Sequence, residues 1–223
     1  MHLPRTPEPE ELMDEAEQAR AYAEADFSDA NERFLELFDL LHPEPFDGTA
    51  VDLGCGPADI PLRFARRHPG ARIDAVDGAP AMLALAGQAL EQAGLEARIR
   101  LHCHHLPATA LPRGAYDAVL SNSLLHHLKD PGDLWRTLRH CAAPGAAVLV
   151  MDLLRPPSTA ALDALVREYA ADAPEVLRRD FRASLHAAYT PEEVQAQLEQ
   201  AGLYHLKVEQ VSDRHLAVRG FLP

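Results

Sequence analysis

Cysteine, long apolar runs and positive charge are all scarce in this sequence of 223 residues. Its three cysteines, Cys55, Cys103 and Cys141, are scattered and odd in number, which favours reduced thiols over a disulfide framework. The apolar stretch at 146–151 stops at Asp152, far short of the roughly 20 residues that a membrane-spanning helix needs. The N-terminus also lacks the basic and apolar regions of a secretory signal. We therefore expect a cytoplasmic protein with no membrane partner.

Acidic residues outnumber basic ones by 34 to 21, and with neutral histidines the formal net charge is −13. An acidic surface repels a phosphate backbone, because nucleic-acid binders gain much of their affinity from clustered Lys and Arg. The composition also argues against disorder, since 47% of the residues are apolar and only 25% are charged. We expect a globular monomer or homodimer whose partner is a small molecule and not a nucleic acid.

Short apolar runs alternate with helical patterns from residue 49 onward. This alternation predicts an α/β fold, in which a mostly parallel sheet is covered on both faces and binds ligands at the carboxyl ends of its strands. Two helical patterns, over 10–25 and 30–41, come first. We expect an N-terminal helical extension or lid at 1–48 and the main domain at 49–223. The expected strands are 50–53, 72–76, 98–103, 116–121 and 147–152, and the expected helices are 59–68, 80–93, 131–141 and 159–171.

The last part of the chain predicts one more helix and two more strands. The segment Thr190-Pro191-Glu192-Glu193 has the pattern of a capping box with proline at the first helical position. The helix is expected over 191–201, because Gly202 follows its last turn. Two strands are expected at 203–211 and 214–219, and their tight connection makes them antiparallel neighbours.

The most informative segment is Asp52-Leu53-Gly54-Cys55-Gly56, which runs from an expected strand into a glycine-rich turn. Glycines there let the backbone pass close to a bound ligand, because no Cβ stands in the way. A dinucleotide fingerprint would need a third glycine at position 59, where Asp59 stands. Its carboxylate would repel a pyrophosphate, so the turn favours a ligand that is uncharged or cationic at that point.

This segment resembles the first motif of the class I S-adenosylmethionine-dependent methyltransferases, in which an acidic and a hydrophobic residue precede G-x-G. The resemblance continues at Asp77, after the second expected strand, and then at 116–119, in the His-His-Leu turn and Asp-Pro of 124–131, and at Pro144-Gly145. It covers about residues 49–152. It implies a Rossmann-like, doubly wound sheet of seven mostly parallel strands with an antiparallel last strand, and S-adenosylmethionine as the cofactor. The layout is similar to that of the quinone-biosynthesis methyltransferases, which act on small molecules.

The resemblance also implies which residues hold the cofactor. In the family an acidic residue after the second strand binds both ribose hydroxyls, and Asp77 takes that place here. The family often has Gly-Asp-Ala after the third strand, with the aspartate accepting a hydrogen bond from the adenine, whereas this chain places His102 and Cys103 there. The implied cofactor contacts are Asp52, Gly54, Cys55, Gly56, Asp77, Gly78, Met82, His102, Cys103, His104, Ser121 and Asn122.

The run His102-Cys103-His104-His105 has two interpretations, a metal site or a set of adenine-pocket and surface histidines. Adjacent residues of a strand point to opposite faces, whereas zinc ligands are spaced two to four residues apart or come from separate elements. We therefore expect no metal at this run.

His126 and His127 follow the fourth expected strand, where the acceptor meets the methyl donor in the family. Methyl transfer needs the acceptor and the methyl carbon held in line, and an imidazole can remove a proton from the acceptor. We predict His126 as this general base, with His127 as its rival. The alternative is that one or both histidines only cap the turn through backbone hydrogen bonds.

Residues 153–189 are expected to form a wall over the substrate, as this region often does in the family. Their arginines either bind an anionic acceptor or pair with neighbouring acids on solvated helix faces. Tyr22 and Phe27 lie in the N-terminal helices, which form the other half of a lid, cover a sheet face or make a dimer contact. Two rival functions are an NAD-dependent oxidoreductase and a catalytically inactive protein that binds S-adenosylmethionine as the partner of another enzyme. No residue pattern identifies the acceptor.

Overall fold

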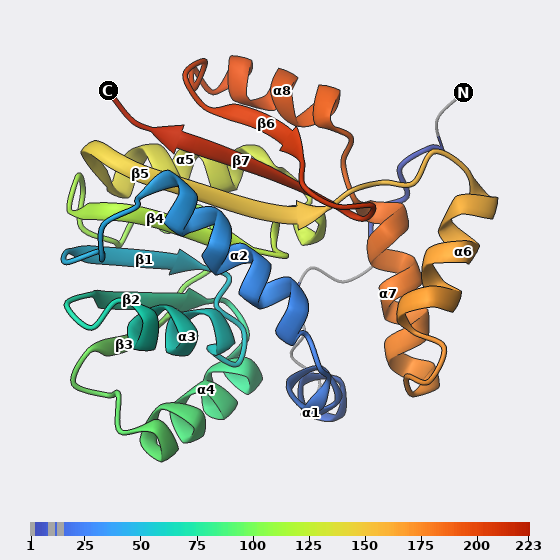
Figure 1. The fold of residues 1–223 in the computed structure, drawn as a ribbon, viewed down its shortest axis with the longest axis horizontal. Helices are drawn as coiled ribbons and strands as arrows, with labels where there is room; N and C mark the ends of the chain where they lie inside the picture. The colour runs from blue at the N-terminus through green and yellow to red at the C-terminus, as the bar shows by residue number, and fades with distance from the viewer. Residues whose placement is uncertain (1–2, 9–11, 13–15) are drawn as a thin grey trace.

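In the computed structural model, the described residues are 3–8, 12 and 16–223, and they form a central sheet with helices on both faces (Figure 1). The sheet has seven strands in the order β3-β2-β1-β4-β5-β7-β6. Neighbours from β3 to β5 are parallel, whereas β7 is antiparallel to both β5 and β6, as the resemblance implies. The strands are β1 (Thr49–Leu53), β2 (Arg72–Asp77), β3 (Ile99–Cys103), β4 (Tyr116–Asn122), β5 (Ala142–Leu153), β6 (Lys207–Gln210) and β7 (His215–Phe221).

The described part of the chain also has eight helices and one short 3-10 turn, of which α1 and α2 precede the first strand. The helix predicted over 10–25 appears as α1, and part of that range lies outside the described residues. The elements are α1 (Ala16–Glu24), α2 (Ser28–Leu41), α3 (Asp59–Arg67), α4 (Pro80–Ala93), η1 (Leu125–His127), α5 (Gly132–Cys141), α6 (Thr159–Tyr169), α7 (Glu175–Ala187) and α8 (Pro191–Gln200).

The two faces of the sheet bury separate apolar clusters, because successive residues of a strand point to opposite sides. On β4, Val119 packs with α5 and α8, whereas Ala118 and Leu120 pack with α2, α3 and α4. The helix α2 is therefore part of the second of these clusters, in which Phe34 and Phe38 are fully buried. Within the described residues, no helix is both long and apolar enough to cross a membrane.

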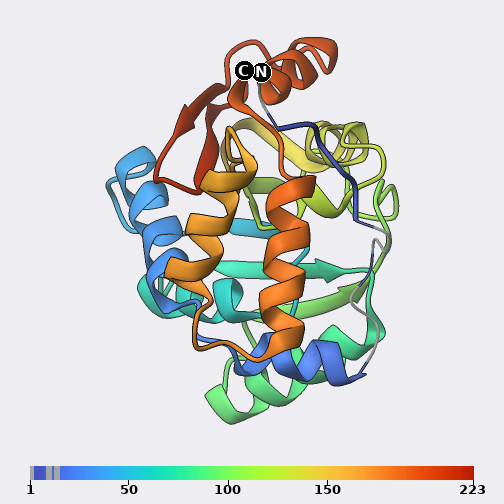
Figure 2. The same ribbon diagram turned by 90° about the vertical axis from the view of Figure 1, so that its right-hand side faces the viewer.

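The helix α7 was not among the predicted elements, and it lies within residues 153–189, where a wall over the substrate is expected. It pairs with α6 in a hairpin beyond the carboxyl end of β5, and Figure 2 shows the two helices side by side. Leu162 of α6 and Leu185 of α7 are fully buried in a small cluster with Leu153. This hairpin and α1 stand at the edge of the sheet where the strands β1, β2, β4 and β5 end (Figure 1).

At the C-terminal end, one predicted helix start is confirmed and one predicted strand is shorter. The capping box at α8 is confirmed, since Thr190 accepts from the backbone N–H of Glu193 and Glu193 accepts from that of Thr190. The strand expected at 203–211 is shorter, because the backbone N–H of Leu206 bonds to Leu203 in a turn before β6 begins.

Candidate active site

A cavity of about 520 Å³ lies where β1, β2 and β4 end, which is where parallel sheets bind ligands. We call it the first cavity. The glycine-rich turn after β1 forms its floor, and both glycines have left-handed backbone angles, with φ of +77° at Gly54 and +51° at Gly56. A Cβ on Gly54 would lie 2.8 Å from Leu124, whereas one on Gly56 would meet no atom within 4 Å. The backbone of Gly56 is therefore open to a ligand.

Asp77 ties this turn to the end of β2. One carboxylate oxygen accepts from the backbone N–H of Gly56 at 2.9 Å, and the other accepts from that of Ala79 at 2.8 Å. Burial raises the pKa of Asp77, and these backbone hydrogen bonds oppose that rise. Each carboxylate oxygen keeps acceptor capacity for a ligand in the cavity, because an ionised carboxylate offers about four lone-pair sites.

Asp52 contributes a second carboxyl group from the end of β1. It is 1% exposed and lines the first cavity, yet its Oδ1 has no hydrogen-bond partner among the described residues. Burial raises the pKa of Asp52 to about 8, and the nearby charge of Asp77 adds to the effect. A buried carboxyl oxygen without a partner is costly, so the site is suited to a ligand that brings a positive charge or a hydrogen-bond donor.

Polar side chains from three elements link up beside the glycine turn. The amide of Asn122, at the end of β4, donates to Asn31 of α2 at 3.0 Å, and Asn31 in turn donates to Asp59 of α3. The side-chain oxygen of Asn122, Oδ1, is buried without a hydrogen-bond partner among the described residues. A donor group of a ligand could bind there.

Most residues implied as cofactor contacts line the first cavity. These are Asp52, Gly54, Cys55, Gly56, Asp77, Gly78, Met82, His104 and Asn122.

Three of the implied contacts lie elsewhere. His102 turns toward Asp74, with its Nε2 3.1 Å from that carboxylate, Cys103 is exposed and outside the cavity lining, and Ser121 is buried and donates to the carbonyl of Leu53. The reason for the first two is register, since Cys103 pairs with Asp77 and β3 ends there. Only residues beyond that point, His104, His105 and Leu106, reach the cavity.

A second cavity, of about 480 Å³, adjoins the first. Its far wall is built from α7 and the β6–β7 turn, with Phe181, Arg214 and His215 among its residues. The guanidinium of Arg214 lies 3.4 Å from the ring centre of Tyr169, which also lines this cavity. The two cavities share their boundary, which is formed by Tyr22, Ala25, Phe27, Asn31, Asn122, Ser123 and His127.

The predicted general base, His126, lines the second cavity and not the first. It is 2% exposed, and its Nδ1 lies 2.7 Å from Asp152 at the end of β5. The other oxygen of Asp152 accepts from the backbone N–H of Leu125 at 2.6 Å. Burial opposes protonation of His126, but the charge and hydrogen bond of Asp152 outweigh it and raise the pKa.

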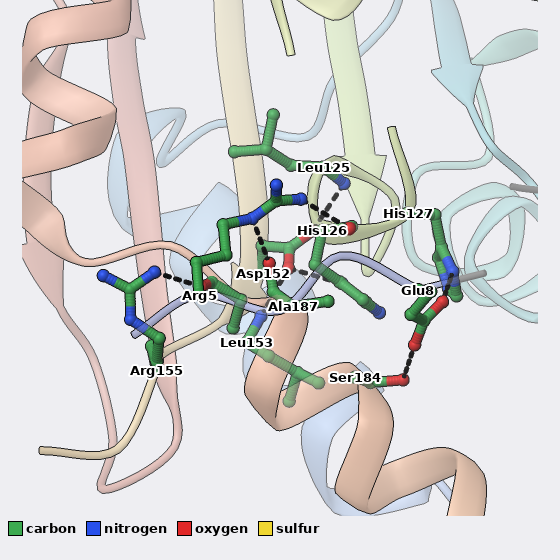
Figure 3. A network of polar contacts seen from close by, with 11 residues as sticks. Arg5, Glu8, Leu125, His126, His127, Asp152, Leu153, Arg155, Ser184 and Ala187 are labelled. Atoms are coloured by element: carbon green, nitrogen blue, oxygen red, sulfur yellow. Dashed lines mark hydrogen bonds and ion pairs between the residues drawn. The ribbon is translucent and has the colours of Figure 1, made fainter. Parts of the chain in front are cut away.

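His127 lines both cavities and forms an ion pair with Glu8, which belongs to the N-terminal segment. Figure 3 shows how this segment reaches η1: Arg5 donates to the carbonyls of Ala187 and His126, and Glu8 accepts from Ser184 of α7 at 2.6 Å. Burial raises the pKa of Glu8, but the hydrogen bond and charge of His127 outweigh it and lower the pKa overall.

Glu8 and Asp152 are therefore functional candidates that the sequence prediction did not include. Asp152 carried a usable signal, because it ends an apolar strand on the edge where ligands bind. Glu8 carried none, since nothing in its local pattern indicates a contact with a residue more than a hundred positions away.

Two arginines of the segment 153–189 hold it in place. Arg155 is buried and donates to the carbonyl of Ala188 and to Glu193, and Arg182 pairs with Asp163. These contacts support the structural interpretation of the segment over an anion site. The cation that does line the second cavity is Arg214, from the β6–β7 turn.

Comparisons with known proteins agree with this geometry. Residues 50–145 match a family described as "Methyltransferase domain". A demethylmenaquinone methyltransferase of Thermus thermophilus is 37% identical over 114 residues, which are 49% of this chain and 49% of that protein. A ubiquinone biosynthesis O-methyltransferase of Dinoroseobacter shibae is 32% identical over 168 residues, or 74% of this chain and 64% of that protein.

A trans-aconitate 2-methyltransferase of Mycobacterium tuberculosis is 36% identical over 125 residues, or 52% of this chain and 42% of that protein. The chain thus spans only about half of the length of the curated relatives it matches.

Solved structures confirm the fold. A SAM-dependent methyltransferase from Aquifex aeolicus superimposes with a TM-score of 0.68 at 18% identity, covering 92% of this chain and 98% of that one. The [4+2]-cyclase SpnF superimposes with a TM-score of 0.60 at 16% identity, covering 88% and 82%. Because a cyclase shares this fold, activity has to be argued from the site.

Proposed function

The chain belongs to the class I S-adenosylmethionine-dependent methyltransferases, and on that premise we propose that it transfers a methyl group from S-adenosylmethionine to a small molecule. The proposal rests on the boundary that the two cavities share. The first has the glycine turn and Asp77, the second has the histidine pair, and His127 and Asn122 line both. A donor in one cavity and an acceptor in the other would meet at that boundary.

The residues of the first cavity fit the cofactor. We propose that Asp77 accepts from the ribose hydroxyls and that the open backbone of Gly56 lets the ligand approach. The carboxyl group of Asp52, which has an oxygen without a partner, suits the cationic end of the cofactor. His104 and His105, and not His102, are the histidines placed to contact its base.

When bound, S-adenosylmethionine supplies a methyl carbon activated by its sulfonium, which the acceptor's lone pair attacks as the carbon–sulfur bond breaks. The main task of the protein is then to hold the acceptor in line with that carbon. Tyr22, Phe27 and Ser123 lie on the boundary between the cavities, where they would restrict the path of the acceptor.

We propose that His126 takes the proton of the acceptor. Asp152 fixes the ring through Nδ1, so that Nε2 is the nitrogen left to receive a proton. His127 has the same arrangement, with its Nδ1 paired to Glu8, and it lines both cavities, so it remains the rival candidate. The carboxylate partners of both histidines, Asp152 and Glu8, support a role beyond capping the turn.

The acceptor is proposed to be a small molecule because the second cavity is of the size of a metabolite pocket and is enclosed by α7. The relatives that the chain resembles are named for quinone precursors and trans-aconitate, which are small molecules. We further propose a cytoplasmic monomer or homodimer with no nucleic-acid partner, in keeping with the net charge of −13.

The lid is also a proposal. Within the expected extension 1–48, α2 is built into the core, so the part free to act as a lid is the N-terminal segment with α1. Tyr22 and Phe27 line both cavities, and their rings lie 4.8 Å apart.

Turnover tests this function directly. The protein is incubated with S-adenosylmethionine and a panel of small acceptors bearing a hydroxyl, an amine or an acidic carbon, and S-adenosylhomocysteine is measured. We expect production with at least one class of acceptor, and much less with Asp77→Ala at a cofactor concentration near the dissociation constant of the unaltered protein. Cofactor binding without turnover on any acceptor would favour the inactive binding protein. The NAD-dependent alternative is disfavoured, because Asp59 lines the first cavity at the position of the third glycine, where its carboxylate would repel a pyrophosphate.

A further inference from the structure

We propose that Glu8, His126 and His127 form a binding site for one divalent transition-metal ion, with zinc as the best match, and that the open coordination position faces the second cavity. Each of the three residues offers one ligand atom, and these atoms all lie within 4.8 Å of one another. No function assigned above depends on such an ion. The site also differs from the run at His102, where we expected no metal.

The backbone brings these three side chains together from two distant parts of the chain. His126 and His127 are neighbours on the 3-10 turn η1, and their ring centres are 4.1 Å apart. Glu8 arrives on the N-terminal segment, which Arg5 fastens to η1 and to the end of α7 (Figure 3). Consecutive residues of a strand point to opposite faces, but on this 3-10 turn the two rings lie side by side, and the third ligand comes from a separate element, as is typical of zinc sites.

The contacts around the three residues orient them as they do around known metal ligands. A metal-bound histidine usually donates its other N–H to a carboxylate, and the Nδ1 of His126 is paired with Asp152 in this way. Glu8 likewise has one oxygen held by Ser184, which leaves the other facing His127. No hydrogen bond joins the Nε2 of His126 to any described residue, although the side chain is 3% exposed.

The donor set determines the class of ion. Two imidazoles and one carboxylate with an open fourth position are the ligands of a catalytic zinc site, whereas magnesium prefers oxygen ligands and keeps several waters. Zinc bonds of about 2.0–2.2 Å place tetrahedral ligand atoms roughly 3.3–3.6 Å apart. The three ligand atoms must therefore contract by about 1 Å at their widest separation, and the direct Glu8–His127 contact must open to admit the ion.

A bound ion would change the role of His126, and this consequence rests on the proposed function. An imidazole nitrogen that binds a metal does not accept a proton at the same time. In the loaded protein the ion's open position would bind the oxygen or nitrogen of the acceptor and lower its pKa, and the released proton would pass to solvent. The methyl transfer itself would be unchanged.

Titration with Co²⁺ and Zn²⁺ tests the site without relying on activity. The full-length protein is stripped with a chelator and titrated with Co²⁺ while the visible absorption is recorded, and Zn²⁺ is added afterwards. We expect intense tetrahedral cobalt bands that saturate at one ion per chain and disappear when zinc displaces it. Glu8→Gln should weaken the affinity at least tenfold, and His127→Ala should weaken it further. His140→Ala, which removes a histidine far from the trio, should have no effect.

Three results would overturn the inference: no saturable binding, only the weak bands of octahedral cobalt, or equal affinities of Glu8→Gln and the unaltered protein. The Glu8–His127 contact would then be an ion pair and nothing more. Binding of S-adenosylhomocysteine, measured on the same samples, separates the two proposals. A failed metal site with normal nucleotide binding leaves the proposed function standing, and the converse result overturns the function alone.

Discussion

The backbone N–H of Gly56 donates to the carboxylate of Asp77 at 2.9 Å, across 21 residues of sequence. This hydrogen bond joins the turn after β1 to the end of β2, so the two motifs of the cofactor site form one unit. The same carboxylate also accepts from the backbone N–H of Ala79, at the start of α4. Asp77 therefore shapes the first cavity as well as lining it.

Asp77→Ala should lower the affinity for S-adenosylmethionine about 30- to 150-fold. A lost carboxylate with two hydrogen bonds to a ligand costs roughly 2–3 kcal/mol. The matched control is Asp117→Ala, which also removes an acceptor of a backbone N–H, that of Thr49, but at the opposite ends of the strands. Calorimetric titration of both variants checks this prediction. Equal losses in the two variants would mean that Asp77 acts only through the fold.

Asp52→Asn should stabilise the ligand-free protein at neutral pH and weaken cofactor binding. The pKa of this carboxyl is raised from 3.8 to about 8, so its contribution to stability is favourable below about pH 4 and is lost as the pH rises toward 8. Thermal unfolding should show that the stability of the variant, relative to that of the unaltered protein, increases between pH 4 and pH 8. Above that range the difference in stability should stay constant. A difference that does not change with pH would contradict the buried, unpaired state of Asp52.

Thr190→Ala should destabilise the fold by about 1 kcal/mol, since it removes the side chain that accepts from the N–H of Glu193. A chain of this size should then unfold at a temperature about 2–4 °C lower. Cofactor affinity should be unchanged, because α8 lies far from both cavities. Thr190→Ser keeps the hydroxyl and should unfold close to the unaltered protein, and a ligand-binding defect in either variant would speak against the capping role.

Two histidine variants test which histidines at or after the end of β3 contact the cofactor. His102→Ala should change the affinity for S-adenosylmethionine less than twofold, because the ring faces Asp74. His105→Ala should weaken binding by severalfold, since that residue lines the first cavity. Calorimetric titrations of the two variants check this prediction. A larger loss of affinity in His102→Ala than in His105→Ala would instead support His102 as the histidine that contacts the adenine.

The order of strands and helices could be predicted from the sequence because apolar periodicity and capping residues are local signals. Thr190 and the glycine turn show this well, since each element starts where its pattern predicts. The helix α7 was missed because its apolar residues are sparse and its buried face depends on α6.

The candidate site was only partly predictable for a similar reason. Gly54, Gly56 and Asp77 carry short-range motifs, whereas the place of His102 depends on the register between β3 and β2. Glu8 reaches His127 only through the path of the whole N-terminal segment, and no local pattern encodes that contact.

The central claim is that the first cavity binds S-adenosylmethionine, and calorimetric titration with S-adenosylmethionine, S-adenosylhomocysteine and NAD tests it most directly. We predict binding of the two sulfur nucleotides in the micromolar range, affinity weakened about 30- to 150-fold in Asp77→Ala, and no heat with NAD. Binding of NAD without the sulfur nucleotides would contradict the account and assign the glycine turn to an oxidoreductase.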